Sequence, residues 1–243
     1  PALVELEHVG LNHLTWERAV RVDGVDKLPE MLTEHADRLA REMRLPADLM
    51  VSLGAIPSSY LRYYYLFDSV LEEQRRGHTR ARDVMEIESR LLELYRDPGL
   101  DQKPPLLAER GGAFYSEAAV QLIASLYDGA GDVQVVDTLN GGALPDLPHD
   151  AVVELPARID RDGAHPLPVA PLAPELRGLV QSAKAYEQLA VEAARTGDRA
   201  VALRALLANP LVGQWEVALP LLEALLSSNR EHLPRFFPQA REA

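Results

Sequence analysis

The sequence predicts an α+β fold, in which a small, mostly antiparallel sheet is packed with several long helices. Short runs rich in alternating or β-branched residues indicate strands at about residues 3–9, 132–140 and 151–160. Longer stretches with apolar residues at helical spacing occupy most of the rest of the chain. The 243 residues, 47% of them hydrophobic, are enough for a sizeable core.

The two later strands are expected to pair with each other. The segment between them, GGALPDLPHD, is rich in turn-forming residues, which favours an antiparallel pair. The proline-rich residues 163–174 that follow predict an irregular crossing loop.

The helices are predicted from periodicity and from proline punctuation. A helix over residues 29–45 starts at Pro29 and stops before Pro46, and Ser116 is expected to cap a later one. The other predicted helices cover about residues 58–74, 81–96, 175–196, 198–208 and 214–228.

The composition excludes several classes of protein. The net charge of −12 disfavours nucleic-acid binding, because such a chain repels phosphodiester backbones. No apolar run approaches the roughly 20 residues that a membrane span needs, and no signal peptide opens the chain. The absence of cysteine excludes disulfides and thiol chemistry within the chain. We expect a soluble, cytoplasmic protein that binds neither nucleic acid nor membrane.

The stretch GLNHLTW places His13 at the end of the first predicted strand, beside Asn12 and shortly after Gly10. Imidazole is a common metal ligand and proton shuttle, and a strand end is a good place to present one. The alternative is a histidine whose hydrogen bonds are satisfied by the backbone. His8 lies on the same strand, but the two histidines are expected to point to opposite faces.

Residues 58–67, SSYLRYYYLF, contain half of the eight tyrosines of the chain. Tyr60 and Tyr64 are expected to share a helix face. Tyrosine can serve as a general base where a neighbouring cation stabilises its anion. The alternative is a set of core tyrosines with solvated hydroxyls.

An arginine-rich stretch, QRRGHTRAR, follows at residues 74–82. Arginine side chains match the oxygens of phosphate, and a helix beginning near Thr79 would add its N-terminal dipole. In an acidic protein this favours a small phosphorylated ligand, and the alternative is a solvated charged turn. The glycines of residues 129–134, GAGDVQ, precede a strand and lack the third glycine of a dinucleotide fingerprint, so the chain shows no cofactor cradle of that kind.

Taken together, these stretches resemble glycoside hydrolase family 4, the NAD- and metal-dependent 6-phospho-glycosidases. The motifs occur in order along most of the chain, and GLNHLTW resembles the 6-phospho-β-glucosidase branch. They are VGLNHL, YLRYYY, TRARDVMEIE, RGGAFYSEAA, LNGGALPDLPHDAVVELPARI and AYEQLAVEAARTGDRAVALRALLANPLV.

The resemblance implies hydrolysis of 6-phospho-β-glucosides to glucose 6-phosphate by oxidation, elimination and addition, an exception to two-carboxylate hydrolysis. NAD takes a hydride from carbon 3 of the sugar, a base removes the proton at carbon 2, and a divalent metal, typically manganese, stabilises the enediolate. The aglycone leaves, water adds and the hydride returns. The fold it implies is similar to the C-terminal domain of lactate and malate dehydrogenases, usually in dimers or tetramers.

Site residues are implied by the motifs that match. His13 matches the family's histidine metal ligand, and Tyr60 best matches the catalytic base, with Tyr63 and Tyr64 as neighbouring alternatives. Arg80 matches the arginine that binds the 6-phosphate, and Asn12 either touches substrate or holds His13.

The family's NAD-binding Rossmann domain and its cysteine metal ligand lie upstream of GLNHL and are not in this sequence. We therefore expect residues 1–243 to be a C-terminal domain for substrate binding, catalysis and oligomerisation that by itself binds neither NAD nor metal and is inactive. The rival hypotheses are a stand-alone, non-catalytic sugar-phosphate-binding or regulatory module and a helical assembly domain without a ligand.

Overall fold

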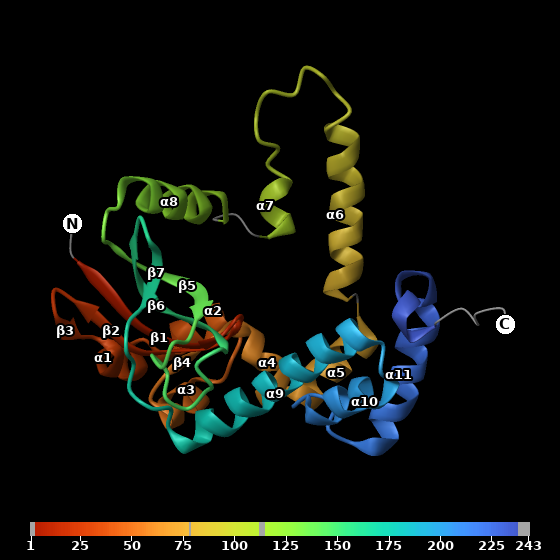
Figure 1. Cartoon of the computed structure of the whole chain (residues 1–243). Coiled ribbons are helices and arrows are strands. Elements are labelled where there is room, and N and C mark those ends of the chain that lie inside the picture. The colour runs from red at the N-terminus through yellow and green to blue at the C-terminus, as the bar shows by residue number, and fades with distance from the viewer. Residues whose placement is uncertain (1–2, 78, 112–114, 238–243) are drawn as a thin grey trace. The chain divides into compact units, whose positions relative to one another are not determined.

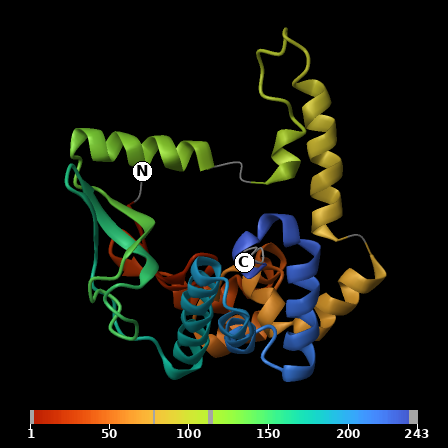
Figure 2. The same cartoon turned by 45° about the vertical axis from the view of Figure 1, so that its right-hand side comes forward.

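The computed structural model describes residues 3–77, 79–111 and 115–237. They form two compact units, shown with the rest of the chain in Figures 1 and 2. The first unit comprises Pro1–Tyr65, Val135–Ala157 and Pro166–Ala243, and the second comprises Leu66–Gln134 and Arg158–His165. None of the helices in the described ranges is long and apolar enough to cross a membrane.

The strands of the described residues form one sheet in the order β3-β2-β1-β6-β5, in which β4 also pairs with β2 and β7 with β6. Its pairs β1–β2, β1–β6, β2–β3 and β2–β4 are antiparallel, which confirms the predicted α+β class with an antiparallel sheet. The strands are β1 (Val4–Leu11), β2 (Leu14–Val22), β3 (Val25–Asp26), β4 (Ile56–Pro57), β5 (Val133–Leu139), β6 (Val152–Asp160) and β7 (Gly163–Pro166).

The main core of the first unit packs the sheet against a long helix, α9 (Pro174–Thr196). The side chains of Val9, Leu11 and Trp16 from the β1–β2 hairpin are buried in it. α9 begins with Pro174 in its first turn and ends at Gly197, whose φ of +74° is left-handed. This packing fixes the hairpin end from which the candidate site projects.

The remaining helices of the first unit lie in two groups. Three short helices near the N-terminus bury a second apolar cluster. Near the C-terminus, α10 (Arg199–Ala208) packs against α9, and α11 (Trp215–Ser228) packs against α10 (Figures 1 and 2). The first group is α1 (Leu28–Glu34), α2 (Ala36–Met43) and α3 (Ala47–Leu53), and the second group is α10 and α11. Shorter helical segments of the same unit are η1 (Ser59–Leu61), α4 (Arg62–Tyr65), η2 (Arg230–His232) and η3 (Pro234–Phe236).

The second unit is mainly helical. A small cluster of Ile87, Leu91 and Leu106 holds α6 (Arg80–Leu94) against α7 (Leu107–Arg110). Thr79 caps α6, because its side chain accepts a hydrogen bond from the Arg82 amide at 3.4 Å. The predicted helix start near Thr79 is therefore confirmed. The unit also contains α5 (Phe67–Arg76) and α8 (Tyr115–Asp128).

Several predicted elements differ from the structure. The helix expected over residues 29–45 is broken at His35 (φ −122°), and that over residues 58–74 is broken at Leu66 (φ −120°). Ser116 lies inside α8 and does not cap it. Strand β7 occupies the start of the proline-rich residues 163–174, because these residues pair with β6.

Strand β2 was not predicted. Its sequence, LTWERAVRV, alternates only partly, and pairing with β1 on one side and with β3 and β4 on the other stabilises the strand.

Candidate functional site

Asn12 and His13 form the two-residue turn of the β1–β2 hairpin, which the pair Leu11 and Leu14 closes. His13 adopts a left-handed conformation with a φ of +63°. Gly10 has a φ of +148°, and a Cβ atom there would lie 2.2 Å from the carbonyl oxygen of Leu14. The tight approach of the two strands therefore requires glycine at position 10, and the turn that follows presents His13.

His13 lines a cavity of about 310 Å³ in the first unit. The His13 and Tyr60 rings are in contact, with their centroids 4.5 Å apart and their planes tilted by 42°. Tyr63 and Tyr64 also line the cavity. Tyr60 and Tyr64, which were expected to share a helix face, therefore lie in the wall of the same cavity. The rest of the wall is Leu11, Asn12, Leu14, Leu61, Leu179, Ala183, Tyr186, Glu187, Asn209, Pro210 and Leu211.

Two carboxylates from distant strands hold the turn. The Asn12 side-chain amide donates to Asp137 Oδ2 at 2.8 Å, and the His13 backbone amide donates to Glu154 Oε2 at 3.3 Å. Asn12 was expected either to touch substrate or to hold His13. Its bond to Asp137 supports the turn that contains His13. Neither acid was among the predicted site residues, because each lies more than 120 positions away along the chain.

His8 lies in β1, two residues before Gly10, and is itself 8% exposed. Its Nδ1 is 2.5 Å from Glu17 Oε1, and its Nε2 is 3.3 Å from Glu154 Oε1. Burial by itself would lower the pKa of His8, but Glu154 and Glu17 outweigh this effect and raise the pKa to about 9. Burial would raise the pKa of Glu154, but the hydrogen bond and the charge of His8 lower it below its ordinary value. His8 is therefore a buried cation between two carboxylates at neutral pH.

Arg80 lies in the second unit, at the start of α6. One nitrogen of its guanidinium, Nη2, donates to the backbone carbonyls of Glu109 and Arg110, each at 2.9 Å. Its side chain is exposed, and its two partners are uncharged. Neither of these acceptors carries a charge, and a guanidinium has N–H donors beyond the one nitrogen used here, which suits the binding of an anion.

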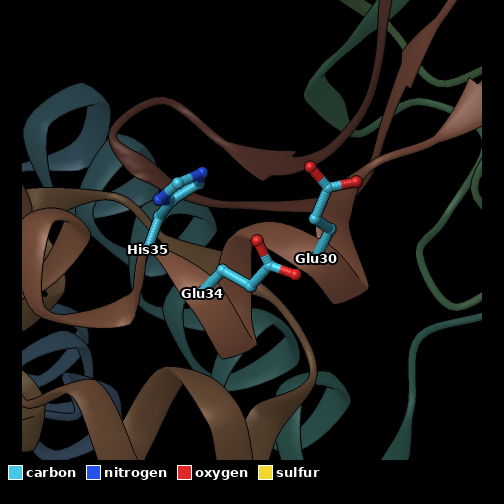
Figure 3. Close-up of side chains that lie close together, drawn as sticks. All are labelled: Glu30, Glu34 and His35. Atoms are coloured by element: carbon cyan, nitrogen blue, oxygen red, sulfur yellow. The ribbon is translucent and has the colours of Figure 1, made fainter.

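Among the residues that the structure describes, one group of three ligand-type side chains has its ligand atoms within 4.8 Å of one another: Glu30, Glu34 and His35 (Figure 3). All three are exposed, and Glu30 is paired with Lys27 at 2.7 Å. His13 is not in such a group. It can offer one nitrogen donor to a metal, but the described residues place no further pair of ligand atoms beside it.

A larger cavity of about 600 Å³ lies among α9, α10 and α11. Its wall is mostly alanine and leucine, with Tyr186 shared between it and the cavity that His13 lines. The contact between His13 and Tyr60 makes the smaller cavity the candidate site.

Residues 8–212 match the family model described as the family 4 glycosyl hydrolase C-terminal domain. The matched range includes the turn, Tyr60 and Arg80, and it identifies a domain of a glycosyl hydrolase. The chain belongs to glycosyl hydrolase family 4, which confirms the resemblance found in the sequence.

The relatives with known names are similar along nearly the whole chain. The chain is 39% identical to a probable 6-phospho-beta-glucosidase of Bacillus subtilis and 34% identical to 6-phospho-beta-glucosidase BglT of Thermotoga maritima. The alignments cover 96% and 95% of this chain but 55% of each relative, so the chain spans about half the length of the curated relatives it matches.

Solved structures show the same fold. The 6-phospho-beta glucosidase from Thermotoga maritima with NAD and glucose-6-phosphate superposes with a TM-score of 0.86 at 34% identity, covering 95% of this chain and 55% of that one. A second crystal structure of that enzyme, with manganese, NAD+ and glucose-6-phosphate, also gives a TM-score of 0.86. These ligands are those of the Thermotoga enzyme.

Proposed function

We propose that the whole protein hydrolyses 6-phospho-β-glucosides to glucose 6-phosphate with NAD and a divalent metal, manganese. The observation that carries this proposal is the contact between His13 and Tyr60 at the cavity wall. It is supported by the identity to two 6-phospho-beta-glucosidases over almost the whole chain. A non-catalytic module that only binds a sugar phosphate would not need a histidine able to bind a metal in contact with a tyrosine able to act as a base.

His13 is proposed to hold the metal through its imidazole, and Tyr60 to remove the proton from carbon 2 of the sugar. When bound, NAD and the metal supply a hydride acceptor and the stabilisation of negative charge on the sugar oxygens. Positive charge beside His13 would favour the phenolate of Tyr60, which makes a tyrosine a competent base. The contact of the two rings places Tyr60 ahead of Tyr63 and Tyr64 for this role.

Arg80 is proposed to bind the 6-phosphate of the substrate. Its guanidinium uses one nitrogen for two neutral carbonyl acceptors, so charge and donors are left for phosphate oxygens. Asn12 is proposed to act on the substrate indirectly, by holding the turn through Asp137. The chain has no glycine-rich dinucleotide fingerprint, so we assign none of its residues to NAD.

The protein is proposed to be a cytoplasmic homodimer or homotetramer. A phosphorylated sugar carries charge that does not cross a bilayer, which favours an enzyme in the compartment where the sugar is phosphorylated. Val120, Ile123 and Tyr127 lie at helical spacing on α8 and are 65%, 64% and 83% exposed. An apolar row of this kind is typical of a subunit interface.

The experiment is to assay the whole protein on an aryl 6-phospho-β-glucoside with and without NAD and Mn²⁺. We expect hydrolysis that needs both, and little hydrolysis of the unphosphorylated β-glucoside or of the 6-phospho-α-glucoside. Binding of glucose 6-phosphate without any turnover would instead favour the non-catalytic module. Turnover without metal would contradict the role of His13.

A further inference from the structure

The hairpin that presents His13 has an apolar face and an ionic face. Val9 and Trp16 are paired across β1 and β2 and are buried in the core. The next pair on the other face is His8 and Glu17, and on the same face Gly10 is opposite Glu154 of β6. Because Gly10 has no side chain, the long Glu154 side chain reaches both His8 and the turn.

Glu154 uses its two oxygens in two directions. Oε1 is 3.3 Å from Nε2 of His8, and Oε2 accepts the His13 backbone amide at 3.3 Å. The other nitrogen of His8 is fixed by Glu17 at 2.5 Å. Glu154 is therefore held by a buried cation that is itself held from the opposite strand.

The turn needs such support. His13 is one of the described non-glycine residues with positive φ, and this conformation carries a steric cost. In a two-residue turn, a small rotation of the backbone redirects the imidazole. We propose that Glu154, held by His8 and Glu17, is a positioning residue that locks His13 in the left-handed conformation and so preorganises its imidazole for the metal.

The fixing of the turn stands on the structure alone, whereas the consequence for the metal rests on the proposed function. Removing the support of a ligand typically weakens metal binding about 10- to 100-fold. A purely structural ion pair would change stability without changing metal affinity.

The test uses Glu154→Gln in the whole protein, which keeps the size of the side chain and removes its charge. The matched control is Glu7→Gln, the neighbouring acid of β1, which is paired with Arg18 at 3.1 Å and Arg21 at 3.0 Å. Mn²⁺ affinity is measured by water-proton relaxation, and amide hydrogen exchange is measured at His13. We expect a rise in the Kd for Mn²⁺ of about 10-fold or more and faster exchange at His13 in Glu154→Gln, but neither change in Glu7→Gln.

A second variant keeps the proposal testable if Glu154→Gln folds poorly. His8→Gln removes the cation but leaves the side chain of Glu154 and the residues of the turn unmutated. A higher Kd for Mn²⁺ and faster exchange at His13 are expected in this variant too. Unchanged exchange at His13 in both variants would overturn the proposal, as would equal changes in Glu7→Gln. If the unmutated protein binds no Mn²⁺, the proposed function fails, and hydrogen exchange at His13 still decides whether Glu154 fixes the turn.

Discussion

The Asn12–His13 turn and the Arg80 guanidinium are held by different kinds of contact. The turn is anchored by the charged side chains of Asp137 and Glu154, and Glu154 is also paired with the buried His8. Arg80 is exposed and bonded to two neutral backbone carbonyls about 30 residues away along the chain.

These contacts suit the turn and Arg80 to different roles. The hydrogen bonds of the turn end on carboxylates, and one of these, Glu154, is itself fixed by the buried His8, so the turn keeps one geometry, which suits a residue that must meet a metal in one orientation. The acceptors of the Arg80 guanidinium are neutral carbonyls, so these contacts are exchanged at little cost for stronger contacts with an anion. Substitutions at the turn should therefore alter catalysis and folding, and substitutions at Arg80 should alter substrate affinity.

The largest effect is expected for His13→Ala. Loss of the metal ligand should lower kcat/KM on a 6-phospho-β-glucoside by about 10³-fold or more in the whole protein, since a metal supplies several kcal/mol of charge stabilisation. The control is His35→Ala, which removes the exposed histidine beside Glu30 and Glu34 and should leave activity unchanged. Full activity in His13→Ala would contradict the role of the turn.

The next effect concerns folding and its pH dependence. The pKa of His8 is raised from 6.5 to about 9, so its contribution to stability is complete below pH 6.5 and is lost as the pH rises through 9. The difference corresponds to about 3 kcal/mol. In urea unfolding, His8→Gln should be less stable than the unmutated protein at pH 6 and nearly equal to it at pH 9.5.

Arg18→Gln is the control for that experiment. It removes a cation that is paired with Glu7 on the same two strands, but arginine stays charged throughout this range. Its loss of stability should therefore be the same at pH 6 and pH 9.5. A similar constant difference in His8→Gln would show that His8 is not a buried cation.

A smaller effect is expected for Arg80→Lys. Lysine keeps the charge but not the planar pair of donors that matches phosphate, so KM should rise about 10-fold while kcat changes little. Arg76→Lys, which alters an arginine paired with Glu72 in α5, should leave KM unchanged. A fall in kcat without a change in KM in Arg80→Lys would show that Arg80 acts in the chemical step and not in substrate binding.

The sequence contains enough information for the fold class, and local patterns in it lead to the candidate residues at the hairpin turn and among the tyrosines. The glycine before Asn12–His13 and the closely spaced tyrosines are local patterns that single out residues of one cavity wall, but the contact between His13 and Tyr60 is seen only in the structure. The break at His35 was missed because the amphipathic pattern continues through it, whereas the backbone does not.

The carboxylates that hold the turn could not be found in the same way. Glu17 is opposite His8 in the hairpin, so recognising β2 would have indicated it. Asp137 and Glu154 reach the turn through β5 and β6, and the order of strands in a sheet is not encoded in the spacing of residues along the chain.

The most direct test of the central claim is exchange of the carbon 2 proton into deuterated solvent during turnover by the whole protein. The contact between His13 and Tyr60 predicts that Tyr60→Phe slows this exchange about 10²-fold or more, and that Tyr64→Phe does not. Slowed exchange in Tyr64→Phe with normal exchange in Tyr60→Phe would contradict the account.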